Sequence, residues 1–157
     1  MIPKKILFCT DFSENSVPAR KCSEEYARAF GAELWILHVV NTSGIGYPSL
    51  EEGVPVDVRA LVESMQRSVD KALELLAAEF HELPFPVKTY SRPGSPSHEI
   101  VRFAEEQGID LIVMGTHGWT GIRHLIMGST AENLVRTEHC PVLTVRCRKD
   151  KPDADRS

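Results

Sequence analysis

Short apolar runs alternate along the chain with segments of helical periodicity, and this alternation constrains the fold more than any other feature. The apolar runs cover residues 5–10, 33–40, 87–91, 111–114 and 142–146. Between them, apolar side chains recur three or four positions apart over residues 17–30, 57–83, 97–107 and 129–137. Apolar strands joined by helices form a parallel sheet with right-handed crossovers. The sequence therefore predicts an α/β protein, with one sheet of five parallel strands and helices on both faces.

The longest helical segment, residues 57–83, carries a continuous apolar stripe, which we interpret as facing the core rather than a partner. Residues 41–55 have the glycine and proline content of a loop, either a flap near a ligand or a variable surface segment. Glycine and proline residues also mark the ends of two predicted helices. Gly31 and Gly108 are placed to end helices, and Pro96 is placed to begin one.

The composition suits a single domain and excludes several classes of protein. With 157 residues, 42% of them hydrophobic, the chain predicts one domain over residues 1–147 and a charged, flexible tail over 148–157. A net charge of -4 argues against binding nucleic acid. Because we find neither a secretory signal nor an apolar run long enough to span a bilayer, we expect a cytoplasmic protein without membrane contact. The four cysteines lack the paired spacing of zinc or redox motifs.

A glycine-spaced segment follows the fourth predicted strand and leads into a helix headed by Ser and Thr. Gly115 and Gly118 are followed, after nine residues, by Gly128, Ser129 and Thr130. Glycines let a backbone approach an anion closely, and the start of a helix offers N–H groups, hydroxyls and a positive dipole end. This layout favours the binding of a polyphosphate ligand. The alternative is that the glycines only turn the chain and a hydroxyl caps the helix. A P-loop is excluded, because no Lys directly follows the second glycine.

The spacing of these glycines resembles the nucleotide-binding pattern of the universal stress protein family. Four further segments resemble the same family in the same order, namely residues 5–13, 35–39, 93–96 and 141–145. The chain therefore resembles a single-domain universal stress protein of the ATP-binding type. The resemblance implies a Rossmann-like doubly wound sheet in the strand order 3-2-1-4-5.

In a sheet of that order, a ligand binds beyond the carboxyl ends of strands one and four, where the winding direction reverses. Thr10 and Asp11 follow strand one, and the resemblance assigns them to adenosine. Asp11 can equally cap the next helix. Val39 is expected to offer backbone contacts and an apolar wall, and Met114 to line the same pocket. Ordinary core packing is the alternative for both.

The phosphates are assigned by the resemblance to Gly115, Gly118, Gly128, Ser129 and Thr130. His117 lies inside this loop and is included as a phosphate contact, with a solvated loop position as its alternative. The expected ligand is ATP, or else ADP or AMP, with Mg²⁺ or Mn²⁺ carried by the phosphates. No protein residue is assigned to a metal.

We find no dedicated catalytic base, because Asp11 is the one acidic residue placed at the pocket and its expected duty is the nucleoside. The resemblance therefore implies a regulatory module that responds to stress by binding ATP and acts on an unidentified protein partner. A slow ATPase or nucleotide-transfer enzyme is the first alternative. A nucleotide-independent interaction protein is the second.

The sequence of the last predicted strand indicates a homodimer. Val142, Leu143, Thr144 and Val145 would form a sheet edge without charges or a bulge to protect it. Antiparallel pairing with the same strand of a second copy would satisfy this edge and give an isologous contact, consistent with the family resemblance.

Overall fold

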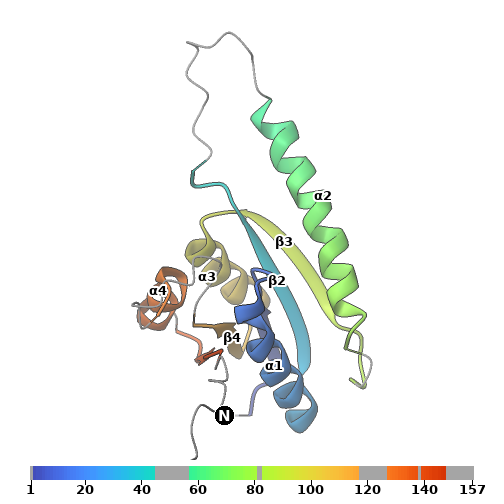
Figure 1. Ribbon diagram of the computed structural model, residues 1–157. Helices are drawn as coiled ribbons and strands as arrows, with labels where there is room; N and C mark the ends of the chain where they lie inside the picture. The colour runs from blue at the N-terminus through green and yellow to red at the C-terminus, as the bar shows by residue number, and fades with distance from the viewer. Residues whose placement is uncertain (1, 45–56, 81–82, 117–126, 138, 148–157) are drawn as a thin grey trace, which may run out of the picture.

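The computed structural model describes residues 2–44, 57–80, 83–116, 127–137 and 139–147. Five parallel strands form one sheet in the order β3-β2-β1-β4-β5. This arrangement confirms the predicted fold class and strand order (Figure 1). The strands are β1 (Lys5–Cys9), β2 (Glu33–Asn41), β3 (Lys88–Gly94), β4 (Leu111–Gly115) and β5 (Val142–Val145). Residues 45–56 and the predicted tail lie outside the described residues.

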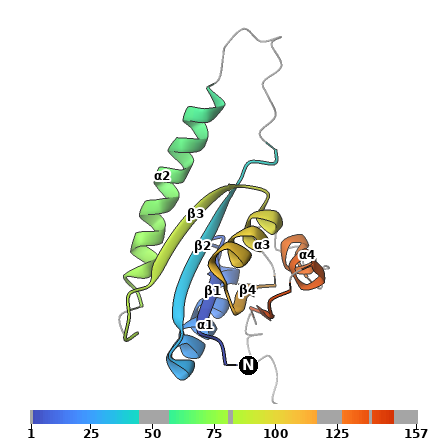
Figure 2. The ribbon, with the colours of Figure 1, turned by 180° about the vertical axis from the view of Figure 1, so that it is seen from behind.

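Helices cover both faces of this sheet, as the sequence predicts (Figures 1 and 2). They are α1 (Val17–Phe30), α2 (Val58–Ala77), α3 (Pro96–Gln107) and α4 (Ser129–Thr137), with a short 3-10 helix, η1 (Glu14–Ser16), before α1. Residues of α1 and α2 pack with one set of strand side chains, and residues of α3 and α4 pack with the other. None of the helices among the described residues combines the length and the hydropathy that a membrane span requires.

Alternate residues of the central strands divide between the two layers of the core. On β1, Leu7 contributes to the α3/α4 side, whereas Ile6 and Phe8 contribute to the α1/α2 side. All three are exposed by 1% or less. Both faces of β1 are thus dry, which explains why its sequence is apolar without interruption.

The predicted helix ends are correct at three positions. Gly31 ends α1 at φ 62° and Gly108 ends α3 at φ 61°, both in the left-handed region that glycine tolerates best. Pro96 is the first residue of α3, where its missing N–H costs no helical hydrogen bond. The third strand is longer than the predicted 87–91, because its pairing with β2 continues to Gly94.

Helix α2 corrects two expectations. It ends at Ala77 rather than at residue 83, because the chain turns and places Phe80 in the core, only 6% exposed. Its stripe is also less buried than predicted: Leu73 is its one fully buried described residue, whereas Leu61 is 45% exposed. The reason is visible in Figure 1, where the N-terminal turns of α2 extend past the ends of β2 and β3.

Candidate functional site

A cavity of about 310 Å³ opens at the carboxyl ends of β1 and β4. It lies at the point where the winding direction of the sheet reverses, which is where ligands bind in this class of fold. Its volume falls within the usual range of small-molecule sites. The described residues that line it are Cys9, Thr10, Asp11, Ser16, Leu37, Asn41, Pro96, Ile100, Met114, Gly115, Thr116, Gly128, Ser129, Thr130 and Ala131.

The lining combines two kinds of surface. Leu37 from β2, Met114 from β4 and Ile100 from α3 supply apolar side chains suited to a flat ring. Hydroxyls and backbone come from the exit of β4 and the start of α4, including Thr116 and Ser129. A ligand with an apolar ring at one end and acceptor oxygens at the other would match both surfaces.

The turn after β1 is held by its own hydrogen bonds. Phe12 N donates to Thr10 Oγ1 at 3.0 Å, and Ser13 donates to Asp11 Oδ1 from both its backbone N (3.0 Å) and its hydroxyl (2.7 Å). Ser16 Oγ in turn donates to Ser13 O at 2.7 Å. Asp11 therefore closes the local turn before η1 while also lining the cavity. It does not cap the next helix as considered above, because the N-cap residues of η1 and α1 are Ser13 and Ser16.

The start of α4 is brought back to the end of β4 by backbone contacts. Gly128 N donates to Thr116 O at 2.6 Å, and Thr116 N donates to Val145 O at 3.1 Å. Glu132 N then donates to Gly128 O at 2.9 Å as α4 begins. The N-terminus of α4, where the helix dipole is positive, consequently adjoins the cavity.

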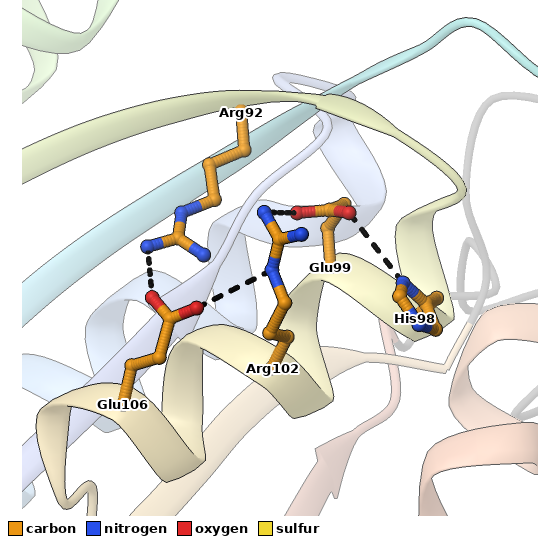
Figure 3. Close-up of polar contacts among 5 residues, drawn as sticks. All are labelled: Arg92, His98, Glu99, Arg102 and Glu106. Atoms are coloured by element: carbon orange, nitrogen blue, oxygen red, sulfur yellow. Dashed lines mark hydrogen bonds and ion pairs between the residues drawn. The ribbon is translucent and has the colours of Figure 1, made fainter.

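Helix α3 forms another wall of the cavity through Pro96 and Ile100, and charged side chains tie the helix to β3 (Figure 3). Arg92 of β3 donates from Nη2 to Glu106 Oε2 at 2.5 Å, and its guanidinium lies 4.8 Å from the centre of the Phe103 ring. The hydrogen bond from Arg92 lowers the pKa of the Glu106 carboxyl.

Glu99 lies in the first turn of α3 with only 6% of its surface exposed. Arg102 Nη2 lies 2.8 Å from Glu99 Oε2, and the same guanidinium reaches Glu106 at 3.4 Å. The Arg102–Glu99 contact is an ion pair without hydrogen-bond geometry, since Oε2 has no hydrogen-bond partner among the described residues. His98 Nδ1 lies 3.5 Å from Glu99 Oε1 (Figure 3). Glu99 is therefore a buried carboxylate balanced by charge.

The structure brings seven of the ten predicted site residues to this cavity. They are Thr10, Asp11, Met114, Gly115, Gly128, Ser129 and Thr130. Val39 is not among the lining residues that the structure describes, and instead packs against the core on the α3/α4 side. That placement favours the alternative of core packing for its side chain. His117 and Gly118 lie outside the described residues.

Several lining residues were missed from the sequence. Thr116 and Asn41 carried a usable signal, because they directly follow or end strands whose carboxyl ends meet at this edge. Ser16 and Ile100 carried none, since they reach the cavity only through the packing of η1 and α3. Among the described lining residues, Asp11 is the one carboxylate. The described part of the chain contains no group of three or more His, Cys, Asp or Glu arranged for a metal ion.

Comparison with known proteins agrees with this architecture. The model of the universal stress protein family matches residues 3–146, nearly the whole chain. The chain belongs to the universal stress protein family. A relative named universal stress protein MJ0531, from Methanocaldococcus jannaschii, is 37% identical to this universal stress protein over 144 residues, covering 91% of this chain and 82% of the relative. The resemblance inferred from the glycine spacing is thereby confirmed.

Solved structures of the family show the same fold. MJ0577, also from Methanocaldococcus jannaschii, superposes with a TM-score of 0.82 at 31% identity, covering 96% of this chain and all of that one. A universal stress protein from Archaeoglobus fulgidus, solved in complex with dAMP, shares the fold at 19% identity with a TM-score of 0.62, covering 93% of this chain and all of that one.

Proposed function

We propose that this universal stress protein binds an adenine nucleotide in the cavity beyond β1 and β4 and acts as a nucleotide-dependent regulatory module. The observation that carries the proposal is the joining of three elements at one cavity: the turn after β1, the exit of β4 and the N-terminus of α4. Each supplies what one part of a nucleotide needs. ATP is the proposed ligand, with ADP and AMP as the shorter members of the same class.

The nucleoside would occupy the end lined by Leu37, Ile100 and Met114, with Asp11 as a hydrogen-bond acceptor for its ribose or base. The phosphates would lie against Gly115, Thr116, Gly128, Ser129 and Thr130, where hydroxyls and α4 backbone N–H groups are the donors. Mg²⁺ or Mn²⁺ would arrive with the phosphates. The contribution of His117 and Gly118 stays a prediction from the sequence.

Relatives support the class of ligand. The Archaeoglobus fulgidus protein holds dAMP, and another universal stress protein of this fold was solved in complex with cAMP. Both ligands contain adenine joined to a phosphorylated sugar. The cavity described above offers an apolar part and a donor-rich part that fit this chemistry.

A regulatory role is favoured over a dedicated enzyme because hydrolysis needs a group that orients water in line with the terminal phosphate. The one described carboxylate of the lining, Asp11, accepts two hydrogen bonds from Ser13. Slow hydrolysis or nucleotide transfer is the alternative function. Residence in the cytoplasm, a regulatory protein partner and a homodimer complete the proposal.

The two ends of the cavity can be tested separately by calorimetry with ATP and adenosine. Replacing Ser129 by Ala together with Thr130 by Val removes two hydroxyls at the phosphate end. Each hydrogen bond to a charged group contributes about 1.5–3 kcal/mol, so the loss of two should lower ATP affinity by at least about 100-fold, while adenosine affinity changes less than about twofold. Asp11→Asn keeps an oxygen for Ser13 and is the matched variant at the nucleoside end. This variant should lower the affinities for ATP and for adenosine by similar factors.

Two results would contradict the proposal. One is a wild-type protein that binds neither ligand at millimolar concentration. The other is a Ser129/Thr130 variant whose affinities for ATP and adenosine fall together, because the hydroxyls would then not face the phosphates.

A further inference from the structure

His38 lies on β2 beside the cavity but is not one of its lining residues. Its neighbours Trp35 and Leu37 belong to the core on the α3/α4 side, whereas Leu34 and Ile36 belong to the α1/α2 side. Because side chains alternate along a strand, His38 shares the α1/α2 side with Ile36. A role for His38 in ligand binding therefore has to act through another residue.

That residue is Thr10. His38 Nδ1 lies 2.8 Å from Thr10 O, and because a carbonyl oxygen only accepts, Nδ1 carries the hydrogen. Thr10 N donates to Leu37 O at 3.0 Å. Two consecutive residues of β2 thus hold both backbone polar groups of Thr10, one through its main chain and the other through its side chain. Thr10 lines the cavity, and Asp11 follows it directly.

The next residue shows why the turn needs support. Phe12 has φ 61°, a left-handed conformation that is unfavourable for a residue with a Cβ, and it is the one such non-glycine residue in the described part of the chain. Its ring centre lies 4.8 Å from that of His38, with 31° between the planes. Unfavourable backbone conformations persist where the surroundings hold them, and they gather at functional sites.

We propose that His38 is the positioning residue of the nucleoside end: its Nδ1–H anchors Thr10 O and its ring supports Phe12, which together fix Thr10 and Asp11 in the cavity wall. The anchoring of the turn follows from the described contacts alone. Its effect on ligand affinity rests on the proposed function. The inference also fixes the tautomer, since a neutral His38 then has its hydrogen on Nδ1 and none on Nε2.

The competing explanation is that His38 only fills space under the turn. Two substitutions separate the explanations. In His38→Asn the side-chain amide nitrogen occupies nearly the place of Nδ1 and keeps a donor. His38→Leu keeps apolar bulk against Phe12 and loses the donor. If His38 only fills space, His38→Leu should resemble the wild type more closely than His38→Asn does. If His38 anchors Thr10 through a hydrogen bond, His38→Asn should resemble the wild type more closely.

The first measurement needs no ligand. In nitrogen-15 NMR of the wild type, His38 should show the Nδ1–H tautomer at neutral pH. Backbone amide exchange should show Phe12 and Ser13 protected in the wild type and in His38→Asn. In His38→Leu, both amides should exchange at least about tenfold faster, because the turn loses its anchor. The Nε2–H tautomer, or equal protection in the wild type and His38→Leu, would overturn the proposal.

The second measurement is calorimetry with ATP and with adenosine. The affinities for ATP and for adenosine should both fall about tenfold in His38→Leu. In His38→Asn, both affinities should stay within about threefold of wild type. Val69→Ala on α2 is the control, since it loosens the core on the same side of the sheet and should leave both affinities unchanged. Equal affinities in wild type and His38→Leu would overturn the positioning role. A wild type that binds neither ligand, yet shows the expected exchange pattern, would contradict the proposed function and support the anchoring.

Discussion

Asp11 illustrates how one residue serves both the fold and the site. Its Oδ1 accepts two hydrogen bonds from Ser13, which fixes the rotamer of the carboxylate at the edge of the cavity. A side chain that is already ordered loses less conformational entropy when a ligand binds. In the proposed complex, the local turn would therefore contribute to affinity indirectly, by ordering the acceptor before the nucleotide binds.

His38 makes the stability of the protein depend on pH in a predictable direction. Burial lowers the pKa of His38 from 6.5, against the opposing influence of the Thr10 carbonyl and the Asp11 carboxylate. The unfolded chain therefore takes up this proton at a higher pH than the folded one. By linkage, the free energy of unfolding falls as the pH drops below about 6.5.

The expected result is a melting temperature that decreases more steeply between pH 7.5 and pH 5.5 in the wild type than in His38→Asn. The other titratable groups are common to both proteins, so the difference in slope isolates His38. Thermal melts followed by circular dichroism at five pH values would measure it. Equal slopes in the two proteins would show that the burial of His38 does not affect the pH dependence of stability between pH 7.5 and pH 5.5.

At the scale of elements, the junction between β3 and α3 depends on one glycine. Gly94 has φ 146°, and a Cβ added there would lie 2.7 Å from Cγ of Glu99. Glu99 is buried and paired with Arg102, so it has little freedom to move. Residues 93–96 resemble the family in sequence, but the sequence does not reveal that a buried carboxylate requires the glycine.

Gly94→Ala should lower the free energy of unfolding by roughly 1–3 kcal/mol, through backbone strain and the collision with Glu99. The matched control is Gly44→Ala, because a Cβ at Gly44 meets no atom of the described residues within 4 Å. That change should stay within about 0.5 kcal/mol. Urea unfolding of the three proteins would measure both effects, and equal midpoints would refute the role of the close approach.

The elements also show what the sequence can and cannot predict. Strand order, helix faces and the caps at Gly31 and Gly108 were predictable, because they depend on local pattern and on family resemblance. The exposure of Leu61 and the early end of α2 were not. Periodicity identifies the apolar face of a helix, but it does not state how far the sheet extends beneath that face.

The candidate site divides in the same way. Thr10, Asp11 and Gly115 were predictable because they directly follow or end strands at one edge. Ile100 and Ser16 depend on how α3 and η1 pack, which no local pattern encodes. The contact of His38 with Thr10 depends on the register of β1 against β2, which no local pattern encodes either.

At the scale of the whole molecule, the open edge of the sheet at β5 is where we expect a second copy. The observed strand order places β5 at an edge, and all four of its residues are partly exposed. An apolar groove beside it is lined in part by Tyr26, Phe30, Val142 and Leu143. An edge strand next to apolar surface favours association, so we still predict a homodimer.

Val142→Lys combined with Thr144→Pro should shift the protein from dimer to monomer at tens of micromolar, because the pair adds like charges across the two-fold axis and removes a backbone donor. Leu75→Lys is the control, since Leu75 is 73% exposed on α2, a helix that packs against β2 and β3 at the other side of the sheet from β5. Sedimentation velocity would compare the three. A monomeric wild type, or a double variant that dimerises as tightly, would remove β5 as the interface.

NMR mapping with ATP can show whether an adenine nucleotide occupies the cavity beyond β1 and β4. On saturation with ATP, the largest amide shifts should fall on residues 10–11, 115–116 and 128–131, which line that cavity. Much smaller shifts are expected in the separate groove beside α2, lined by Val58, Val62 and Gln66. Shifts that centre on the α2 groove, or a spectrum that does not change with ATP, would contradict nucleotide binding in this cavity.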